Sequence, residues 1–401
     1  MQEKWSHRAD LAETAINDRH AGPLWSLPRT NLARVSWPAL FKERLFIHWH
    51  YWWQAHYLDC QVDAALRQPT KTRSARIANT MRGIKLRQLR GLERNKYYDD
   101  KAWLALAFGR IEKAEKFGTP PQLHALRSNL RAGLDESLGV APWRDSRSTF
   151  YNVPTNGPVA IMLARTGYWQ EAIHIVDWVF DNLHNDDGLI MDGMRMRMNG
   201  PEIVRDIHPY CQGVMLGASL EIALKLREEH GIHSLEDIQS VHEAERADEG
   251  MPYISRIRGL VHAIAQHMAT PAGVIDWDTG DGDGGLFKGI LLRYLADVAV
   301  RLPDDSPANR ATRKLATRLV RASAESVWTH RLEVDGLPVF ATDWTSDALL
   351  PHNFGLGPMS IREKVGVVRI AERDLSVQLS GWMALEAMAR VALAEGDPAA
   401  G

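Results

Sequence analysis

The chain has 401 residues, of which 45% are hydrophobic and 24% are charged, so it can bury a large core and is not intrinsically disordered. Its 48 basic and 50 acidic residues give a formal net charge of -2 without a long block of Lys or Arg, so the sequence carries no electrostatic footprint for nucleic acid or an anionic membrane. We expect no nucleic-acid partner and no membrane insertion. Two cysteines, Cys60 and Cys211, are too few for a disulfide framework or a cysteine-based zinc site, and they predict a reducing compartment.

The first residues of the chain carry no targeting signal. Residues 1–11 lack the apolar run of a secretion signal, and no segment reaches the roughly 18 consecutive apolar residues of a membrane-spanning helix. We therefore expect a cytoplasmic protein, unless a leader has been removed. The basic stretch from Lys71 to Arg94 is divided by helical spacing, and we interpret it as a solvated helix face.

Helical periodicity recurs along almost the whole chain, whereas strictly alternating apolar runs are nearly absent, so the prediction is an all-α protein. Breaker residues such as Gly, Pro and Asn separate the periodic segments. The predicted helices, twelve in number, cover residues 7–20, 41–67, 74–93, 100–117, 122–137, 155–165, 169–184, 208–230, 254–269, 285–302, 308–330 and 375–395.

No segment between these helices has the composition of an interdomain linker. Twelve helices without a linker fit six helical hairpins closed into a ring, an (α/α)6 barrel that forms one catalytic domain over residues 1–401. The competing architecture is an α-solenoid, which requires a repeat of about 34 to 47 residues. No such repeat is visible in the sequence.

A pair of adjacent acids, Asp99 and Asp100, precedes the apolar run that starts at Ala102. Neighbouring helical side chains do not face each other, so two such acids usually serve only to stabilise a helix N-terminus. Because neighbouring Cα atoms lie about 3.8 Å apart, the carboxylates can also come within roughly 5 to 6 Å of each other, the separation of retaining glycosidases. From the residues alone, both interpretations stay open.

Aromatic side chains are dense in residues 48–59, which read HWHYWWQAHYLD. Trp49, Trp52, Trp53 and His56 share helical spacings of three and four, so they form a stripe that is either core or one wall of a cleft. The histidine spacing does not match the HExxH pattern of a helix-borne zinc site, and we expect no metal here.

Other candidate motifs fail at defined positions. The acidic stretch 276–285 would place Gly280 and Phe287 where an EF-hand loop needs oxygen ligands, which argues against calcium. Trp103 stands where a prenyl-chain DDxxD motif needs its third aspartate. Walker, nucleophile-elbow and dinucleotide-binding sequences are absent from suitable contexts, so we expect no cofactor.

The stretch YYDDKAWLALA, with its paired aspartates and the following tryptophan, resembles the signature of glycoside hydrolase family 76, the endo-α-1,6-mannanases built on an (α/α)6 barrel. Further stretches in the order typical of that family are WWQAHYLD at 52–59, YNVPTNGP at 151–158, MDG at 191–193, YCQGVMLGA at 210–218, FKGILLRYL at 287–295 and SVQLSGWMALEAMA at 376–389. The resemblance implies a retaining glycosidase that acts on α-mannan or a mannose-containing oligosaccharide without a cofactor.

The resemblance implies that Asp99 is the nucleophile and Asp100 the general acid/base. Structural roles remain open for several expected substrate contacts: Asn156 as a helix cap, Asp192 in a turn, Lys288 in an ion pair and Phe287 in the core. The expected substrate-binding residues are Trp52, Trp53, His56, Tyr98, Asn156, Asp192, Tyr210, Gln212, Phe287 and Lys288.

One departure from the family pattern is Cys211, which stands in the YCQG stretch where many members carry Asn, so a substrate contact at that position is in doubt. Two rival functions remain: a transglycosylase or sugar epimerase on the same fold, and a non-catalytic glycan-binding protein. The sequence leaves endo or exo action, branch tolerance, the physiological glycan and the oligomeric state open.

Overall fold

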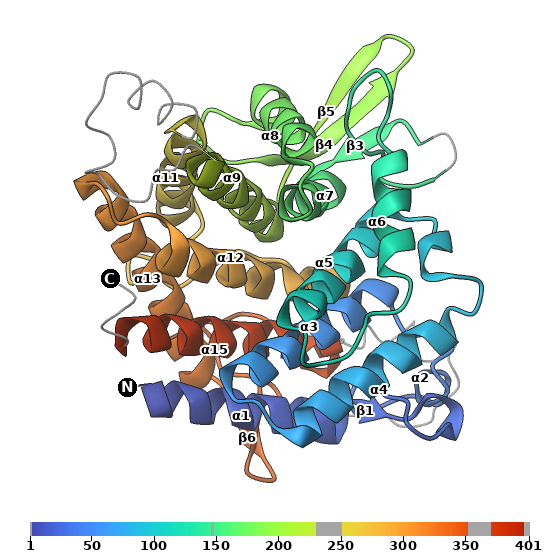
Figure 1. Ribbon diagram of the computed structural model, residues 1–401. Helices are drawn as coiled ribbons and strands as arrows, with labels where there is room; N and C mark the ends of the chain where they lie inside the picture. Colours follow the sequence, from blue (N-terminus) through green and yellow to red (C-terminus); the bar gives the residue numbers. More distant parts are fainter. Residues whose placement is uncertain (1, 146–147, 230–250, 352–369, 397–401) are drawn as a thin grey trace, which may run out of the picture.

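The computed structural model describes residues 2–145, 148–229, 251–351 and 370–396. Helices dominate these residues, and every predicted helix is present there (Figure 1). The α-helices are α1 (Gln2–Arg19), α2 (Phe41–Arg44), α3 (Tyr51–Arg67), α4 (Lys71–Arg87), α5 (Tyr98–Ala114), α6 (Leu123–Ala132), α7 (Val153–Arg165), α8 (Trp169–Leu183), α9 (Pro209–Glu229), α11 (Met251–His267), α12 (Phe287–Arg301), α13 (Pro307–Thr329) and α15 (Leu375–Gly396).

Six of these helices form a closed inner ring. Helix α3 packs on α5, α5 on α7, α7 on α9, α9 on α12, α12 on α15, and α15 returns to α3. Helices α1, α4, α6, α8, α11 and α13 pack outside this ring, each against inner neighbours. The fold is therefore the (α/α)6 barrel expected from the sequence.

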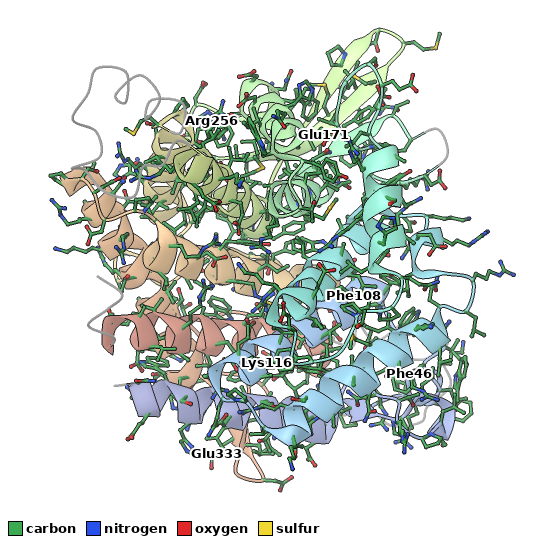
Figure 2. The ribbon with its side chains drawn as sticks, in the orientation of Figure 1. Phe46, Phe108, Lys116, Glu171, Arg256 and Glu333 are labelled. Atoms are coloured by element: carbon green, nitrogen blue, oxygen red, sulfur yellow. The ribbon has the colours of Figure 1, made fainter. Side chains whose placement is uncertain are left out.

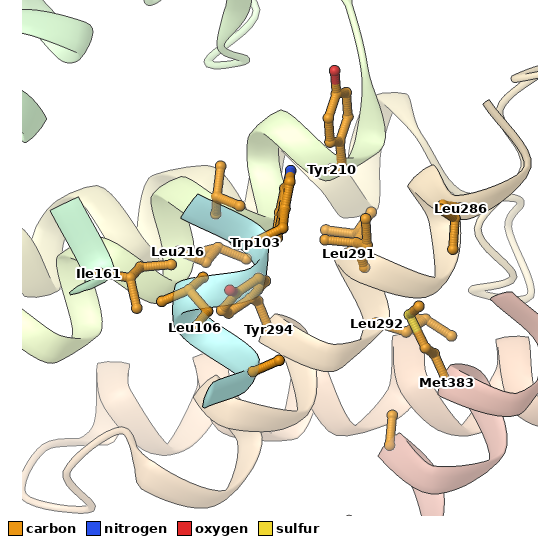
Figure 3. Packing of buried hydrophobic residues seen from close by; sticks show 14 of the residues in the cluster. Trp103, Leu106, Ile161, Tyr210, Leu216, Leu286, Leu291, Leu292, Tyr294 and Met383 are labelled. Carbon is orange, nitrogen blue, oxygen red and sulfur yellow. The ribbon is translucent and has the colours of Figure 1, made fainter. Parts of the chain in front are cut away.

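Burial explains which helices lie inside. Nearly every residue of the inner helix α7 is buried, and so is every residue of α15 from Leu375 to Ala389, because other parts of the chain cover these helices on all sides. The outer helix α8 instead buries one apolar stripe that includes Ile175 and Val179. Figure 2 shows Phe108 within the ring and Glu171 on an outer helix, and Figure 3 shows Ile161, Leu216 and Leu291 converging from three inner helices.

Buried side-chain amides fasten the start of four inner helices to the segment that leads into each helix. Gln54 on α3 accepts a hydrogen bond from the backbone N–H of Ala33 at 2.9 Å and donates to the carbonyl of the same residue at 2.8 Å. Asn156, Gln212 and Gln378 make the same pair of bonds. Their partners are Ala141, Ile190 and Phe340. These clamps hold the loops at the end of the ring where the inner helices begin, which we call the N-terminal end.

Short antiparallel sheets add to the helices. A three-stranded sheet has the order β3 (Phe150–Asn152), β4 (Met191–Arg197) and β5 (Gly200–Ile207). Its β4–β5 hairpin, which the sequence analysis missed, projects from the edge of the barrel (Figure 1). The remaining strands pair as β1 (Ala21–Gly22) with β2 (Leu32–Ala33), and β6 (Leu332–Val334) with β7 (Leu337–Val339).

One predicted helix is interrupted. The segment expected as a single helix over 41–67 contains the short α2 and then α3, because Phe46 and His50 have positive φ angles of 53° and 41° that a helix cannot contain. Residue 230, the expected end of another helix, lies outside the described residues. In the part of the chain that the structure describes, no helix is long and apolar enough to cross a membrane.

Candidate active site

Asp99 and Asp100 occupy the first turn of α5, at the N-terminal end of the ring. Both side chains are half-buried, so they lie at the boundary between the packed interior and solvent. Tyr97 is the helix N-cap and provides no side-chain cap. The two acids therefore stand next to helix N–H groups, where the macrodipole favours negative charge.

Different donors bind the two carboxylates. The indole N–H of Trp143 donates to Oδ2 of Asp99 at 3.0 Å, and the backbone N–H of Asp100 donates to Oδ1 of Asp99 at 2.8 Å. Asp100 receives one side-chain bond, from Nδ2 of Asn95 to its Oδ2 at 2.6 Å. The carboxylate of Asp99 is thus the better stabilised as an anion.

The surroundings separate the pKa values of the pair. Burial raises the pKa of Asp99 to about 6, against the lowering effect of the two donors. Burial and then the charge of Asp99 raise the pKa of Asp100 well above its usual range, although the Asn95 amide opposes this rise. At a pH between the pKa of Asp99 and the higher pKa of Asp100, the pair holds one proton, and that proton resides on Asp100.

Two further carboxylates, those of Asp283 and Asp192, stand near the pair. Oδ1 of Asp283 accepts hydrogen bonds from the indoles of Trp52 and Trp53 at 2.9 and 2.8 Å. The charge of Asp283 contributes to the raised pKa of both Asp99 and Asp100. The structure therefore gathers acids here without an opposing cation in ion-pair contact with Asp99 or Asp100, as far as the described residues go.

Asp192 belongs to the same acidic region. It is the second residue of β4, beside the register irregularity between Met191 and Gly193. Burial raises its pKa to about 7, the charges of Asp206 and Asp99 add to this, and Arg195 opposes it. A carboxyl with such a pKa can accept or donate a hydrogen bond near neutral pH.

Aromatic rings from four inner helices form a continuous series beside these acids. Tyr210 stacks on Phe287 with ring centroids 3.9 Å apart, and Phe287 lies 6.5 Å from Trp52. Trp52 contacts His56 at 5.4 Å, and His56 contacts Trp103 at 4.7 Å. Figure 3 shows Trp103 and Tyr210 directed toward the same side of the packed core. Such flat faces are suited to packing against sugar rings.

His56 is enclosed in this series and is 2% exposed. Within the described residues, neither of its ring nitrogens has a hydrogen-bond partner. Burial, with a contribution from the charge of Arg293, lowers its pKa well below the usual value, so the imidazole is neutral. His56 therefore contributes an uncharged aromatic surface beneath Trp52.

Four of the expected substrate contacts lie away from the exposed surface of the site. Asn156 and Gln212 are fully buried, and their amides bind the backbone of the clamped loops. Lys288 donates to the carbonyl of Thr342 at 2.6 Å, and burial lowers its pKa to about 8. The ring of Tyr98 packs under the ammonium of Lys101, 3.7 Å from its centroid. These side chains support the site from behind its surface.

Asn95, Trp143 and Asp283 are site residues that the sequence analysis did not select. Asn95 lies only five positions before Asp100, so the neighbourhood of the pair was a usable signal. Asp283 lies in the acidic stretch that was tested only as a calcium loop. Trp143 carried no signal, because it approaches Asp99 only through the fold.

The described residues contain no group of three or more His, Cys, Asp or Glu side chains arranged to hold a metal ion. Cys60 and Cys211 are both buried free thiols. Burial raises the pKa of Cys211 well above its usual value, so it remains a neutral thiol next to Tyr210 in the sequence YCQG. Asp99, Asp100 and Asp192 are carboxyl groups with raised pKa values at this end of the ring.

Comparison with known proteins agrees with the helical ring. The family model described as glycosyl hydrolase family 76 matches residues 29–225, which include Asp99, Asp100 and Asp192. The chain belongs to glycosyl hydrolase family 76. Membership of family 76 supports a glycoside hydrolase activity. A comparison with curated protein sequences finds no match.

Solved structures share the fold over nearly the whole chain. The α-1,6-mannanase of Salegentibacter sp. HEL1_6 is 23% identical, with a TM-score of 0.73 over 96% of this chain and 99% of that chain. The Lin0763 protein from Listeria innocua is 23% identical, with a TM-score of 0.75 over 97% of this chain and 98% of that chain.

A further structure is an inactive variant of the Salegentibacter enzyme with two adjacent aspartates replaced by asparagine, in complex with α-1,6-mannotriose. It is 22% identical to this chain, with a TM-score of 0.73 over 96% of this chain and 99% of that chain. At these identities, the likenesses establish the shared fold.

Proposed function

We propose that this family 76 chain is a retaining glycoside hydrolase that cleaves α-1,6-mannosidic linkages within mannan backbones. The observation that carries the proposal is the half-buried pair of Asp99 and Asp100, in which one carboxyl keeps a proton and the other does not. The inactive double variant of the Salegentibacter mannanase, which lacks two adjacent aspartates, supports the same assignment.

Double displacement assigns one role to each acid. Asp99 attacks the anomeric carbon while the glycosidic C–O bond breaks, and Asp100 gives its proton to the departing oxygen. Asp100, now a carboxylate, then takes a proton from water. The resulting hydroxide oxygen bonds to the anomeric carbon and releases Asp99.

The order of the pKa values fits these roles. Asp99 must be ionised when substrate binds, and its pKa of about 6 allows this at neutral pH. Asp100 must carry a proton at the same pH, and burial together with the charge of Asp99 keeps it protonated. As Asp99 becomes bonded to the sugar, its charge disappears, and the pKa of Asp100 falls toward that of a base.

Substrate contacts are proposed for the accessible members of the site. Trp52 and Phe287 offer ring faces to mannose units, and Asp192 and Asp283 offer carboxylate oxygens to hydroxyl groups. Tyr210 is buried and supports Phe287 by stacking on it. Trp53, His56, Tyr98, Asn156, Gln212 and Lys288 would act indirectly, by holding these groups in place.

The test is to incubate the protein with linear α-1,6-mannan and to follow product sizes and anomeric configuration. A ladder of short oligosaccharides with initially α-configured reducing ends supports the proposal. Mannose as the sole product would indicate exo action, and β-configured products would indicate inversion. Products longer than the substrate would identify a transglycosylase, and binding without cleavage would identify a glycan-binding protein.

Matched variants connect the result to the acid pair. Asp99→Asn and Asp100→Asn should each abolish the ladder while preserving the helical circular dichroism spectrum. Asp187→Asn changes an exposed acid outside the site and should keep full activity. Hydrolysis at a near-normal rate by either variant of the pair would refute the mechanism.

A further inference from the structure

Large apolar side chains are exposed around α2, beside the N-terminal end of the ring. Phe41 is 74% exposed and Leu89 is 75% exposed, so these side chains project into solvent instead of lining a hollow. Scattered exposed apolar residues are ordinary, whereas a gathered set marks an interaction surface. We define the α2 patch as Trp25, Leu27, Leu40, Phe41, Leu45, Ile47 and Leu89.

Specific contacts hold the parts of the patch together. The indole N–H of Trp25 donates to the carbonyl of Leu45 at 2.9 Å. Arg87, near the end of α4, donates through Nε to the carbonyl of Phe46 at 2.9 Å, and its guanidinium lies 6.0 Å from the Trp25 ring centroid. Figure 1 shows α2, β1 and the end of α4 together at one corner of the molecule.

The patch adjoins the acidic site. The guanidinium of Arg87 lies 5.1 Å from the ring centroid of Trp49, and Trp49 contacts Tyr51 edge-on at 5.7 Å. Tyr51 is the first residue of α3, directly before Trp52 and Trp53, whose indoles bind Asp283. The patch and the carboxylates therefore share the N-terminal end of the ring.

The two segments that carry most of the patch, residues 21–50 and 82–96, contain many bases and few acids. Glu43 is the only acid among residues 21–50, and it is buried and bound to Ser36 and to the backbone N–H of Leu40. Glu93 is the only acid among residues 82–96. The exposed bases of the same two segments are Arg29, Lys42, Arg44, Arg82, Lys85, Arg90, Arg94 and Lys96.

We propose that the α2 patch docks the protein onto the surface of an anionic lipid bilayer. Exposed aromatic and aliphatic side chains with Lys and Arg beside them are the combination that binds at the bilayer interface: the apolar groups enter the headgroup boundary and the bases contact anionic headgroups. An acidic protein partner would also match the positive charge of the patch. The apolar side chains project into solvent, however, so they fit a deformable partner such as a fluid lipid bilayer better than a rigid protein surface. Docking is peripheral, since it uses no membrane-spanning helix.

Docking at the α2 patch fixes the orientation of the barrel relative to the membrane. A bilayer at the α2 patch holds the N-terminal end of the ring, with Asp99 and Asp100, close to the membrane surface. The inference does not depend on the proposed hydrolase activity, because it rests on exposure and charge alone.

Vesicle sedimentation with the full chain tests the proposal. We expect the protein to sediment with vesicles of phosphatidylcholine containing phosphatidylglycerol and to remain in solution with pure phosphatidylcholine. Phe41→Ser with Leu89→Ser should lower the partition coefficient at least about tenfold. Lys42→Glu with Arg90→Glu should lower it by about thirtyfold or more.

Leu66→Ser with Leu393→Ser provides the matched control. Both leucines are 45% exposed, and they lie near the C-terminal ends of α3 and α15, at the opposite end of the ring. This variant should bind vesicles as the unmodified protein does, and all variants should keep the same melting temperature within a few degrees.

Three outcomes would overturn docking. They are no binding to anionic vesicles, equal binding to neutral and anionic vesicles, and equal loss in the control variant. Patch-dependent binding of soluble polyglutamate without vesicle binding would also overturn it and would identify an acidic protein segment as the occupant.

Discussion

Asp99 and Asp59 both stand on inner helices of the same ring, yet their carboxylates have opposite surroundings. Asp59 contacts the guanidinium groups of both Arg110 and Arg293, and these lower its pKa although burial alone would raise it. The hydrogen-bond donors to Asp99 among the described residues are neutral, other acids lie nearby, and its pKa rises to about 6. The same residue type is thus a fixed anion at one level of the barrel and a titrating group at the other.

This difference depends on which acids form ion pairs with arginine. Asp59 and Asp63 share two arginines that come from α5 and α12, so the ion pairs join three inner helices inside the ring. Acids that must exchange protons cannot have such partners, because a nearby guanidinium would keep them ionised at every working pH. The N-terminal end accordingly keeps cations out of ion-pair contact with Asp99 and Asp100.

Removal of one acid of the pair should have the largest effect. We expect Asp99→Ala and Asp100→Ala each to lower kcat on linear α-1,6-mannan by about 10³-fold or more. The first variant lacks the nucleophile and the second lacks the proton donor. With an aryl α-1,6-mannobioside, azide should give a β-configured glycosyl azide from Asp99→Ala and an α-configured one from Asp100→Ala, as read by NMR. The same configuration from both variants would contradict the assignment.

Removal of one interior arginine should affect stability and not chemistry. Arg293→Met leaves Asp59 and Asp63 with one arginine between them, and we expect the free energy of unfolding to fall by about 3–5 kcal/mol. The matched control, Arg197→Met, breaks the exposed pair with Glu202 and should change it by less than about 1 kcal/mol. Equal melting temperatures for the two variants would show that the interior ion pairs of Arg293 stabilise the protein no more than the exposed pair of Arg197.

Neutralising Asp100 and neutralising Asp59 should change the stability of the protein in opposite directions. The folded-state pKa of Asp100 is raised, so this carboxyl favours folding at low pH and loses that contribution as pH rises through the folded-state pKa. Asp100→Asn should therefore stabilise the protein at pH 8 by about 1 kcal/mol or more and have little effect at pH 3. Asp59→Asn should destabilise it at pH 8, because a lowered folded-state pKa contributes stability there. Thermal unfolding at both pH values checks the signs.

A smaller effect is expected from the donor to Asp99. Trp143→Phe removes the indole hydrogen bond that lowers the pKa of Asp99, so the acid limb of kcat/KM, expected near pH 6, should move to higher pH. Activity at pH 6 should fall by about tenfold, the effect of one hydrogen bond to a charged group. Trp178→Phe on the outer helix α8 is the control and should leave the limb in place. A downward shift would contradict the contribution given to Trp143.

The smallest effect, of opposite sign, is expected from Asp283. Its charge raises the pKa of both Asp99 and Asp100, so Asp283→Asn should move the whole pH profile to lower pH. The amide oxygen can still accept from Trp52 and Trp53, so maximal kcat/KM should change by less than about tenfold. An unchanged profile would show that Asp283 does not act on the pair electrostatically.

Helix positions could be read from the sequence because the 3.6-residue period is a local property. The break between α2 and α3 could not, since residues 45–50 are apolar and aromatic, and only the left-handed conformations of Phe46 and His50 end the helix. The β4–β5 hairpin carried a usable signal, namely alternating residues before Asn199 and Gly200, but helical periodicity elsewhere in the chain concealed it.

Site residues divide in the same way. Asp99 and Asp100 are adjacent in the chain, so one short motif was enough to find them. Asn156 and Gln212 were selected with them because both belong to similar family stretches, but their amides bind backbone groups 15 and 22 positions away in sequence. A local pattern cannot distinguish an amide that binds sugar from one that binds a loop.

By itself, the sequence located the helices and the two adjacent acids, because periodicity and adjacency are properties of near neighbours in the chain. The number of helices then favoured the barrel. Only the tertiary structure decided which acids keep a proton, since the pKa values depend on burial and on donors such as Trp143, 44 positions from Asp99. It also placed Arg87, from the basic stretch Lys71 to Arg94, beside Trp25 of the α2 patch. Charge and exposure at a point in space are sums over residues that folding brings together, and no single segment contains them.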